Sequence, residues 1–287
     1  MYRIREKQVL SDVTQLIVVD APAVAKKAMA GQFVVLLIDE HGERIPMTIA
    51  DYDRDAGTIT LVFEDVGKST MQLGTMKAGD CLLTVVGPLG HPTEIKNYGS
   101  VICIGGGVGV APIFPIARAL REAGNTVVSI IGARTGKLLL WEDRMRDVSS
   151  KLYVCTDDGS RGEKGLVIEP LKKLLDERVG EFARVIAIGP SRMMEKVSEV
   201  TMPYKVPTIV SLNSIMIDGI GMCGGCRVET ADGSRFVCVD GPDFDAHKVN
   251  WEHLESRLKF YRELEWLSLE RWKHRCALDG VVEEGSK

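Results

Sequence analysis

This 287-residue sequence lacks the marks of a membrane, exported or nucleic-acid-binding protein. Its longest unbroken apolar run, residues 33–38, is far too short to span a bilayer. The first ten residues, MYRIREKQVL, are charged and contain no apolar stretch, so we expect no secretory signal. The formal net charge is only −4, from 36 basic and 40 acidic residues, which argues against general nucleic-acid binding.

Cysteine is sparse, and the number of cysteines is odd. Of the seven, three are clustered near the C-terminus and four are scattered through the chain (Cys81, Cys103, Cys155 and Cys276). Scattered cysteines in apolar surroundings such as VICIGGG are typical of buried core thiols. An odd count without a regular framework indicates a reducing compartment, so we expect a cytoplasmic protein.

The composition is that of a folded chain with room for more than one core. Hydrophobic residues make up 45% of the sequence and charged residues 26%, which is ordinary for a globular protein. A length of 287 residues favours two domains.

Residues 1–98 have the pattern of an all-β domain. Short apolar and β-branched runs at residues 15–19, 32–37, 58–63 and 81–86 are separated by turns such as Asp55-Ala56-Gly57. Strands this short and this evenly spaced predict a small barrel.

Residues 99–212 alternate between strand and helix patterns. We expect strands at residues 101–104, 126–131, 152–155, 184–188 and 208–212, and helices at residues 111–123, 168–178 and 192–201. This alternation predicts a mostly parallel α/β sheet with helices on both faces.

Two further regions complete the chain. Residues 213–248 form a glycine-rich segment that contains the clustered cysteines, and residues 249–287 form a tail. Apolar residues at positions 251, 254, 258, 261, 264 and 267 have helical spacing, so we expect a helical tail. Its aromatic residues, Trp251, Tyr261, Trp266 and Trp272, suit either packing on its own domain or an interface with a partner.

The clustered cysteines and one aspartate have the spacing of a metal centre. Asp218, Cys223, Cys226 and Cys238 follow the pattern D-x4-C-x2-C-x11-C. Plant-type [2Fe–2S] sites use C-x4-C-x2-C and a distant fourth cysteine, and Asp218 stands where the first cysteine would stand. The glycines around them let backbone N–H groups approach sulfur closely, which tunes such a cluster. We therefore predict a [2Fe–2S] cluster held by these four residues.

Two other interpretations of the cysteines remain open. A C-x2-C pair often holds zinc, and His247 is near enough in sequence to complete such a site. The pair could also be a redox dithiol, but that motif usually opens a helix, whereas the following residues, RVET, predict a strand.

A glycine-rich turn joins the first predicted strand of the α/β region to its first helix. Gly105 to Gly107, Val108 and Gly109 lead into Pro112, which fits the first turn of a helix. Bare backbone at a helix N-terminus offers N–H donors to a diphosphate. The standard dinucleotide fingerprint is incomplete, because Val110 stands at its third glycine. A tight structural connection is therefore the alternative to a nucleotide site.

Other small and polar residues follow the neighbouring predicted strands. The carboxyl ends of parallel strands share one edge of the sheet, which is where ligands bind. Asp157 and Asp158 could accept hydrogen bonds from ribose hydroxyls and would repel a 2′-phosphate, so we expect NAD(H) and not NADP(H). The predicted NAD(H) site comprises Gly106, Gly107, Val108, Gly109, Pro112, Gly132, Arg134, Asp157, Asp158, Gly189 and Pro190.

The β region carries a second motif, Arg44-Ile45-Pro46-Met47-Thr48. Together with the GGGVGVAP turn it resembles the ferredoxin–NADP reductase superfamily, in which this segment cups a flavin. The resemblance implies FAD, with Arg44 on its diphosphate and Thr48 near its ring system. It assigns FAD to Arg44, Pro46, Met47, Thr48, Gly67, Lys68, Ser69 and Thr70.

The order of flavin barrel, NAD domain and cysteine segment narrows the resemblance. A chain with this order is similar to the electron-transfer subunit of dihydroorotate dehydrogenase. It is more similar to the small subunits of electron-bifurcating NADH-dependent ferredoxin:NADP oxidoreductases, also described as sulfide dehydrogenase subunits, which share one Asp and three Cys ligands. The resemblance implies a heterodimer with a larger flavin and iron–sulfur subunit, and an indirect link to ferredoxin. Wider relatives have Cys where Ile188 stands and end in an aromatic residue, whereas this chain ends EEGSK.

The function that follows is electron transfer between unlike carriers. We expect hydride to move between NAD(H) and FAD, and single electrons to move between FAD and the cluster. No side chain is expected to act as a catalytic acid or base, since the flavin carries that chemistry. The alternatives are a dihydroorotate dehydrogenase electron-transfer subunit and, in a different class, a zinc-stabilised nucleotide-binding regulator.

Overall fold

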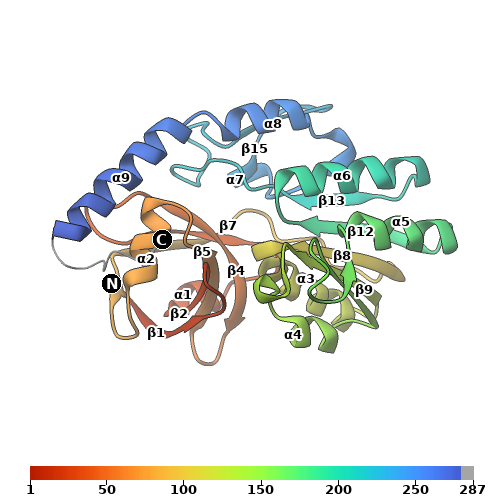
Figure 1. Cartoon of the computed structure of the whole chain (residues 1–287), viewed down its shortest axis with the longest axis horizontal. Coiled ribbons are helices and arrows are strands. Elements are labelled where there is room, and N and C mark those ends of the chain that lie inside the picture. Colours follow the sequence, from red (N-terminus) through yellow and green to blue (C-terminus); the bar gives the residue numbers. More distant parts are fainter. Residues whose placement is uncertain (279–287) are drawn as a thin grey trace.

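The computed structural model describes residues 1–278, which form a barrel, an α/β layer and a C-terminal region that bridges them (Figure 1). Among these residues, no helix is both long and apolar enough to cross a membrane. The fold class predicted from the sequence is confirmed, and most predicted elements lie within two residues of their observed bounds.

The N-terminal domain is a seven-stranded antiparallel sheet in the order β6-β1-β2-β5-β4-β3-β7. Its strands are β1 (Tyr2–Val9), β2 (Thr14–Asp20), β3 (Phe33–Leu37), β4 (Ile45–Asp53), β5 (Thr58–Glu64), β6 (Cys81–Leu82) and β7 (Thr84–Leu89). Two helices, α1 (Pro22–Ala25) and α2 (Lys68–Thr75), connect them. The inward side chains, among them Ile17, Leu36 and Ile59, are fully buried and form one core.

One predicted strand is divided at the seam where the sheet closes. The pattern at residues 81–86 predicts a single strand, but β6 pairs with β1 at one edge and β7 pairs with β3 at the other. Only Leu83 separates β6 from β7, and its N–H donates to the carbonyl of Ile38 at 3.2 Å. The chain therefore turns the corner of the barrel here, and its pairing partner changes.

The second domain is a seven-stranded sheet in the order β11-β10-β9-β8-β12-β13-β16. All neighbouring strands are parallel except β13 and β16. The strands are β8 (Ser100–Gly106), β9 (Thr126–Ala133), β10 (Lys151–Thr156), β11 (Glu163–Lys164), β12 (Phe182–Ile188), β13 (Thr208–Ser211) and β16 (Asp243–Asp245).

Helices cover both faces of this sheet. The helices are α3 (Val110–Glu122), α4 (Glu142–Asp147), α5 (Ile168–Glu177) and α6 (Ser191–Thr201), with short 3₁₀ turns η1 (Gly107–Gly109), η2 (Gly136–Leu138) and η3 (Met202–Tyr204). Residues of α3 and α4 share one buried cluster, and residues of α5 and α6 share the other. Because both faces are buried, the central strands are almost uniformly apolar.

The cysteine segment is fastened to the α/β sheet. Its hairpin, β14 (Arg227–Thr230) and β15 (Gly233–Phe236), leads into the short helix α7 (Val237–Asp240). The strand β16 then pairs antiparallel with β13 at the edge of the sheet. Residues of this segment, such as Cys226, Val228 and Cys238, belong to the same buried cluster as α5 and α6.

The helical tail predicted from the apolar spacing consists of two helices in the structure. After η4 (Ala246–Lys248), α8 (Trp251–Leu258) packs on the α/β domain through buried Leu254. The helix ends at Leu258, and α9 (Arg262–Leu278) runs back across the molecule to α2 of the barrel (Figure 1). The tail thus packs on its own chain, although Leu264 and Trp266 remain exposed.

Candidate redox site

The glycine-rich turn lies where β8 ends and α3 begins, against the end of β12. Gly107 has a φ of +56°, a conformation that glycine adopts without strain. A Cβ atom on Gly109 would lie 2.3 Å from the carbonyl oxygen of Ile188, so only glycine fits this close approach. The turn therefore needs two of its glycines for backbone reasons, and it exposes N–H groups at the start of α3.

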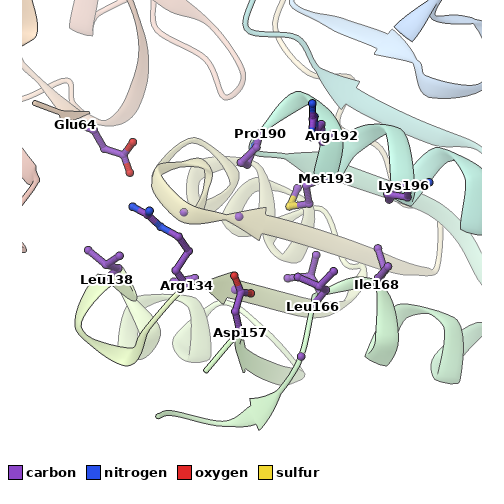
Figure 2. A pocket seen from close by; sticks show the side chains of 16 residues that line it. Glu64, Arg134, Leu138, Asp157, Leu166, Ile168, Pro190, Arg192, Met193 and Lys196 are labelled. Carbon is purple, nitrogen blue, oxygen red and sulfur yellow. The ribbon is translucent and has the colours of Figure 1, made fainter. Parts of the chain in front are cut away.

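A cavity of about 500 Å³ opens along the carboxyl ends of β8, β9, β10 and β12 (Figure 2). Its volume falls in the usual range for small-molecule and cofactor sites. It is lined by Glu64, Gly106, Gly107, Gly132, Ala133, Arg134, Leu138, Asp157, Gly165, Leu166, Val167, Ile168, Pro190, Arg192, Met193 and Lys196. The structure thus brings together six residues predicted for NAD(H): Gly106, Gly107, Gly132, Arg134, Asp157 and Pro190.

Of the two aspartates predicted to face a ribose, only Asp157 lines the cavity. Asp158 instead accepts hydrogen bonds from the N–H of Ser160 at 2.9 Å and from its hydroxyl at 2.6 Å. These bonds hold the pKa of Asp158 below its usual value. Asp158 therefore closes a surface turn.

Charged residues that the sequence does not single out also face this cavity. Arg192 and Lys196 lie one turn apart on α6, and they join the predicted Arg134, which follows β9, in the lining. Glu64 reaches in from the end of β5, and Figure 2 shows its carboxylate and the Arg134 guanidinium pointing toward one another. Burial raises the pKa of Glu64, and the positive charge of Arg134 opposes that rise.

A second cavity, of about 510 Å³, lies between the two domains. Predicted flavin residues Pro46, Met47 and Thr48 line its barrel side, and predicted nucleotide residues Val108, Gly109, Pro112 and Gly189 line its opposite side. The two cavities share four residues: Glu64, Gly106, Gly107 and Pro190. A ligand in one is therefore next to a ligand in the other.

The segment that follows β13 forms another wall of this second cavity. Leu212, Asn213, Ser214 and Met216 line it, together with Ile188. The terminal residues 279–287, which lack the aromatic of wider relatives, lie outside the described residues. Among the described residues, the segment 212–216 therefore forms this wall of the second cavity.

The remaining predicted flavin residues lie outside these two cavities. Gly67, Lys68, Ser69 and Thr70 line a third cavity at the start of α2. Arg44 is exposed, in the loop just before β4. Thr70 Oγ1 accepts hydrogen bonds from the N–H groups of Gly67 and Val66, at 3.0 and 3.1 Å, which fixes the entry to α2.

The four predicted cluster ligands form two close pairs. The sulfur atoms of Cys226 and Cys238 are 3.2 Å apart and buried. Asp218 accepts a hydrogen bond from the N–H of Cys223 at 2.7 Å and another from the N–H of Ile220 at 3.0 Å. The bond from Ile220, then the bond from Cys223, lower the pKa of Asp218, so its carboxylate is anionic.

Backbone N–H groups point at sulfur, as the glycine content predicts. The N–H of Gly225 donates to Cys223 Sγ and the N–H of Cys238 donates to Cys226 Sγ, both at 3.4 Å. Burial, followed by the neighbouring Cys226, raises the pKa of the Cys238 thiol. A buried thiol pair of this kind needs a cationic centre to become thiolate.

The donor set fits a two-iron cluster better than a single zinc ion. Among residues 1–278, no three His, Cys, Asp or Glu side chains surround one metal-ion position. His247, the alternative zinc ligand, forms a hydrogen bond between Nε2 and Thr201 Oγ1 at 2.9 Å. Two separate pairs of ligands, with N–H donors to sulfur, suit a centre with two metal atoms.

The cysteine loop lies against the barrel beside the second cavity. Gly219, directly after Asp218, has a φ of +73°, and a Cβ atom there would lie 2.6 Å from Val35 Cγ2 of β3. Met216, two residues before Asp218, lines the second cavity. The predicted cluster ligands are therefore joined to the wall of the predicted flavin site by a few residues of tightly packed chain.

Two protein families match parts of this chain. Residues 213–250 match the iron-sulfur cluster binding domain of dihydroorotate dehydrogenase B. Residues 103–199 match the oxidoreductase NAD-binding domain. These ranges contain all four predicted cluster ligands and the turn between β8 and α3.

Individual proteins match over most of their length. The dihydroorotate dehydrogenase B (NAD(+)) electron transfer subunit homolog of Thermotoga maritima is 48% identical, over 88% of this chain and 89% of that protein. A chain from the NADH-dependent reduced ferredoxin-NADP oxidoreductase, a structure concerned with flavin-based electron bifurcation, is 44% identical with a TM-score of 0.90; the match covers 95% of this chain and 98% of that chain. A ferredoxin NADP+ reductase from Neisseria gonorrhoeae, with bound FAD and NADP, shares the fold at 17% identity and a TM-score of 0.59, over 71% of this chain and 90% of that one.

The fold and the site define a class, the oxidoreductases with a ferredoxin–NADP reductase fold. Within this class, the chain belongs to the family of dihydroorotate dehydrogenase B electron transfer subunits and their homologues. It contains an NAD-binding domain and an iron–sulfur cluster-binding segment. The superfamily, the iron–sulfur cluster and NAD predicted from the sequence are confirmed.

Sequence reasoning missed several residues of the site. Arg192 and Lys196 are four residues apart in the sequence and come soon after Gly189-Pro190. This spacing places both side chains on one face of a helix, at the edge of the sheet where ligands bind. That signal was present in the sequence. Glu64 had no signal, because it is the last residue of an ordinary strand and reaches the site only through the packing of the two domains.

Proposed function

We propose that this chain is the small electron-transfer subunit of a ferredoxin:NADP oxidoreductase, with FAD in the second cavity and NAD(H) in the first. FAD, when bound, exchanges a hydride with the nicotinamide and single electrons with an iron–sulfur cluster. The observation that carries the proposal is the shared wall of the two cavities, with the cluster ligands joined to the same wall through Met216.

The residues around the cavities position the reactants and exclude water. Thr48 presents its hydroxyl to the second cavity, and Gly106 and Gly107 leave the space between the cavities free of side chains. Gly109 lets α3 begin directly against β12, so its N–H groups face a diphosphate. Arg192 and Lys196 offer cations to the same phosphates. Catalysis here consists of positioning and electrostatics, without a side chain that transfers protons.

Asp157 favours NAD(H) over NADP(H). Its carboxylate faces the first cavity from the end of β10, where it can accept a ribose hydroxyl and would repel a 2′-phosphate. Arg134 is paired electrostatically with Glu64. We assign NADH as the two-electron carrier on the strength of Asp157.

The cysteine loop is the place where a larger partner subunit binds. Cys223 is exposed, and four apolar side chains near it are also exposed: Ile217, Ile220, Met222 and Val239. Met222 is 83% exposed, which is costly for an apolar residue beside a redox centre unless a partner covers it. Electrons would leave through this face to a second redox centre and, indirectly, to ferredoxin. The free thiols suit a reducing cytoplasm.

A visible spectrum of anaerobically purified protein tests the cofactors. We expect a yellow-brown protein with one FAD and two iron atoms per chain, whose flavin absorbance bleaches on addition of NADH. A colourless protein that contains zinc would contradict the proposal and support the nucleotide-binding regulator.

Substitution Met222→Glu tests the partner face. A buried charge should weaken the complex at least tenfold, because an unpaired carboxylate is costly in an interface. The control is Val179→Glu, which adds the same charge at an exposed position in the turn just after α5. Size-exclusion chromatography with the partner is the measurement, and equal loss in both variants would argue against this face.

Dihydroorotate dehydrogenase electron transfer is the second candidate, supported by the similarity to the Thermotoga maritima protein. The two candidates differ in their large subunits. Identification of the subunit that co-purifies with the tagged chain distinguishes them. The aspartate at position 218 favours the first candidate, because the dihydroorotate branch resembles this chain except for a fourth cysteine there.

A further inference from the structure

A third cavity, of about 410 Å³, lies between the start of α2 and the tail helix α9. It is lined by Glu43, Val66, Gly67, Lys68, Ser69 and Thr70 from the barrel, and by Arg262, Glu265, Trp266, Ser268 and Leu269 from α9. Figure 1 shows α9 crossing from the cysteine region to α2, so this cavity exists only because the tail returns to the barrel. Neither family match includes α9.

Glu43 connects the two sides of the cavity. Its carboxylate accepts a hydrogen bond from Ser69 Oγ at 2.6 Å and one from Ser268 Oγ at 3.4 Å. The helix α9 is therefore held over the first turn of α2. Trp266, although apolar, is 60% exposed at this position.

The chemistry of the lining matches one half of a dinucleotide. Lys68 and Arg262 are cations beside the first turn of α2, whose N–H groups lack intrahelical partners and favour phosphate. Glu43 can accept hydrogen bonds from sugar hydroxyls. Trp266 and Leu269 offer an apolar surface on which a purine can stack. Groups suited to a phosphate, a sugar and a base thus line one cavity.

Two separate stretches of chain lead from this cavity to the second one. Glu43 lines the third cavity, and Pro46, three residues later, lines the second. On the neighbouring strand, Glu64 lines the second cavity and Val66 lines the third. Two or three extended residues span about 7–10 Å. Arg44 lies between Glu43 and Pro46 in the chain, where it is exposed.

We propose that α9 forms the outer wall of the site for the adenosine end of FAD, with Trp266 stacked on the adenine and Arg262 facing the diphosphate. This proposal rests on the FAD assignment made above. It gives the tail a role in this chain: α9 holds the half of the cofactor that FMN lacks. The tail would thereby set the preference for FAD over FMN.

The test compares flavin affinities of the full-length chain after the flavin is removed. Dissociation constants for FAD and FMN are measured from the quenching of flavin fluorescence. We expect Trp266→Ala to raise the FAD constant about tenfold and leave the FMN constant unchanged, since one base stack is lost. Trp266→Phe should restore most of the affinity for FAD. Trp272→Ala is the matched control, because this tryptophan lies on α9 but does not line the cavity.

Each outcome separates the two proposals. Equal weakening of FAD and FMN, or no weakening of FAD, would overturn the role of α9 and leave the flavin assignment intact. Equal affinities of the wild-type chain for FAD and FMN would also overturn the role of α9 and leave the flavin assignment intact. A wild-type chain that binds neither flavin would refute the flavoprotein assignment, and the α9 proposal would be rejected with it.

Discussion

Asp218 brings one carboxylate into a set of three thiols, at the end of the loop nearest the barrel. A carboxylate is a harder donor than a thiolate, so it changes the electron density on the metal to which it binds. Two backbone N–H groups already hold it as an anion. The residue is thus suited to a cationic centre, and as a predicted cluster ligand it would be a lever on the reduction potential.

Substitution Asp218→Cys should change the cluster without removing it. Four thiolates are also a competent [2Fe–2S] ligand set, so iron content should be retained. We expect a shifted midpoint potential and altered electron paramagnetic resonance g-values. Redox titration followed by that resonance is the measurement. An unchanged midpoint potential together with unchanged g-values would mean that Asp218 is not a ligand.

Asp243 is a buried acid where the cysteine segment meets the barrel. It accepts a hydrogen bond from Thr93 Oγ1 at 2.6 Å, but its Oδ1 atom is buried without a partner among the described residues. Burial is the main cause that raises the pKa of Asp243 to about 6 from 3.8. The folded chain therefore binds this proton more tightly than the unfolded chain, and stability falls as pH rises from about 4 to about 6.

Substitution Asp243→Asn should remove this pH dependence. The neutral amide avoids a penalty of up to about 3 kcal/mol that the carboxylate imposes above pH 6. Relative to wild type, we expect the melting temperature of the variant to improve between pH 4.5 and pH 7.5. The exposed carboxylate Asp12, replaced in the same way, is the control. If the melting temperatures of wild type and Asp243→Asn changed in parallel with pH, a raised pKa of Asp243 would be contradicted.

At the scale of elements, the turn between β8 and α3 is determined by the strand beside it. Isolated, a run of glycines predicts only a tight connection. In the fold, Gly109 lies against the carbonyl of Ile188 at the end of β12, so three elements meet within one turn. This contact fixes where α3 starts and hence where its free N–H groups point.

Substitution Gly109→Ala should push this turn away from β12. The added methyl group would lie 2.3 Å from a backbone oxygen, and such overpacking costs about 1–3 kcal/mol. We expect a lower melting temperature and an NADH affinity reduced about tenfold, measured by calorimetry. For the melting temperature, Gly67→Ala is the control, because its methyl group would meet no atom within 4 Å. Equal melting temperatures would show that the turn can adjust.

For the molecule as a whole, an ion-pair cluster joins the barrel to the α/β domain. Asp51 of β4 pairs with Arg118 of α3 at 2.9 Å and with Arg144 of α4. The Arg144 guanidinium also stacks on the rings of Phe114 and Trp141, 4.2 and 4.1 Å from their centres. Because both cavities lie between or beside these domains, these ion pairs also set the geometry of the two cavities.

Substitution Asp51→Asn should loosen the contact between the domains. Two half-buried guanidinium groups would lose their charged acceptor, which costs about 1–3 kcal/mol of unfolding free energy. Urea denaturation measures the loss, and the rate of flavin reduction by NADH should also fall. The more exposed pair of Arg5 and Asp20 lies within the barrel, so Asp20→Asn should cost under about 1 kcal/mol. Similar losses in the two variants would refute a special role for Asp51.

Much of the fold could be predicted because its signals are local. Residues 101–104, 126–131 and 152–155 were predicted as strands and form the centres of β8, β9 and β10. The apolar tail pattern predicts helix but not the place where the structure divides it into α8 and α9. The break at residues 259–261 lets α9 reach the barrel, and a pattern of spacing holds no information about that distant surface.

The sequence by itself determined the order of the all-β and α/β regions and the place of the glycine turn, and it predicted the cluster ligands, because each depends on residue types at short, fixed spacings. Only the tertiary structure decided which residues share a cavity. Glu64 meets Arg134, Met216 covers the second cavity and Trp266 faces α2 because surfaces from distant parts of the chain pack together. Those contacts arise from burial of apolar surface between whole elements, which is non-directional and leaves no mark in the local sequence.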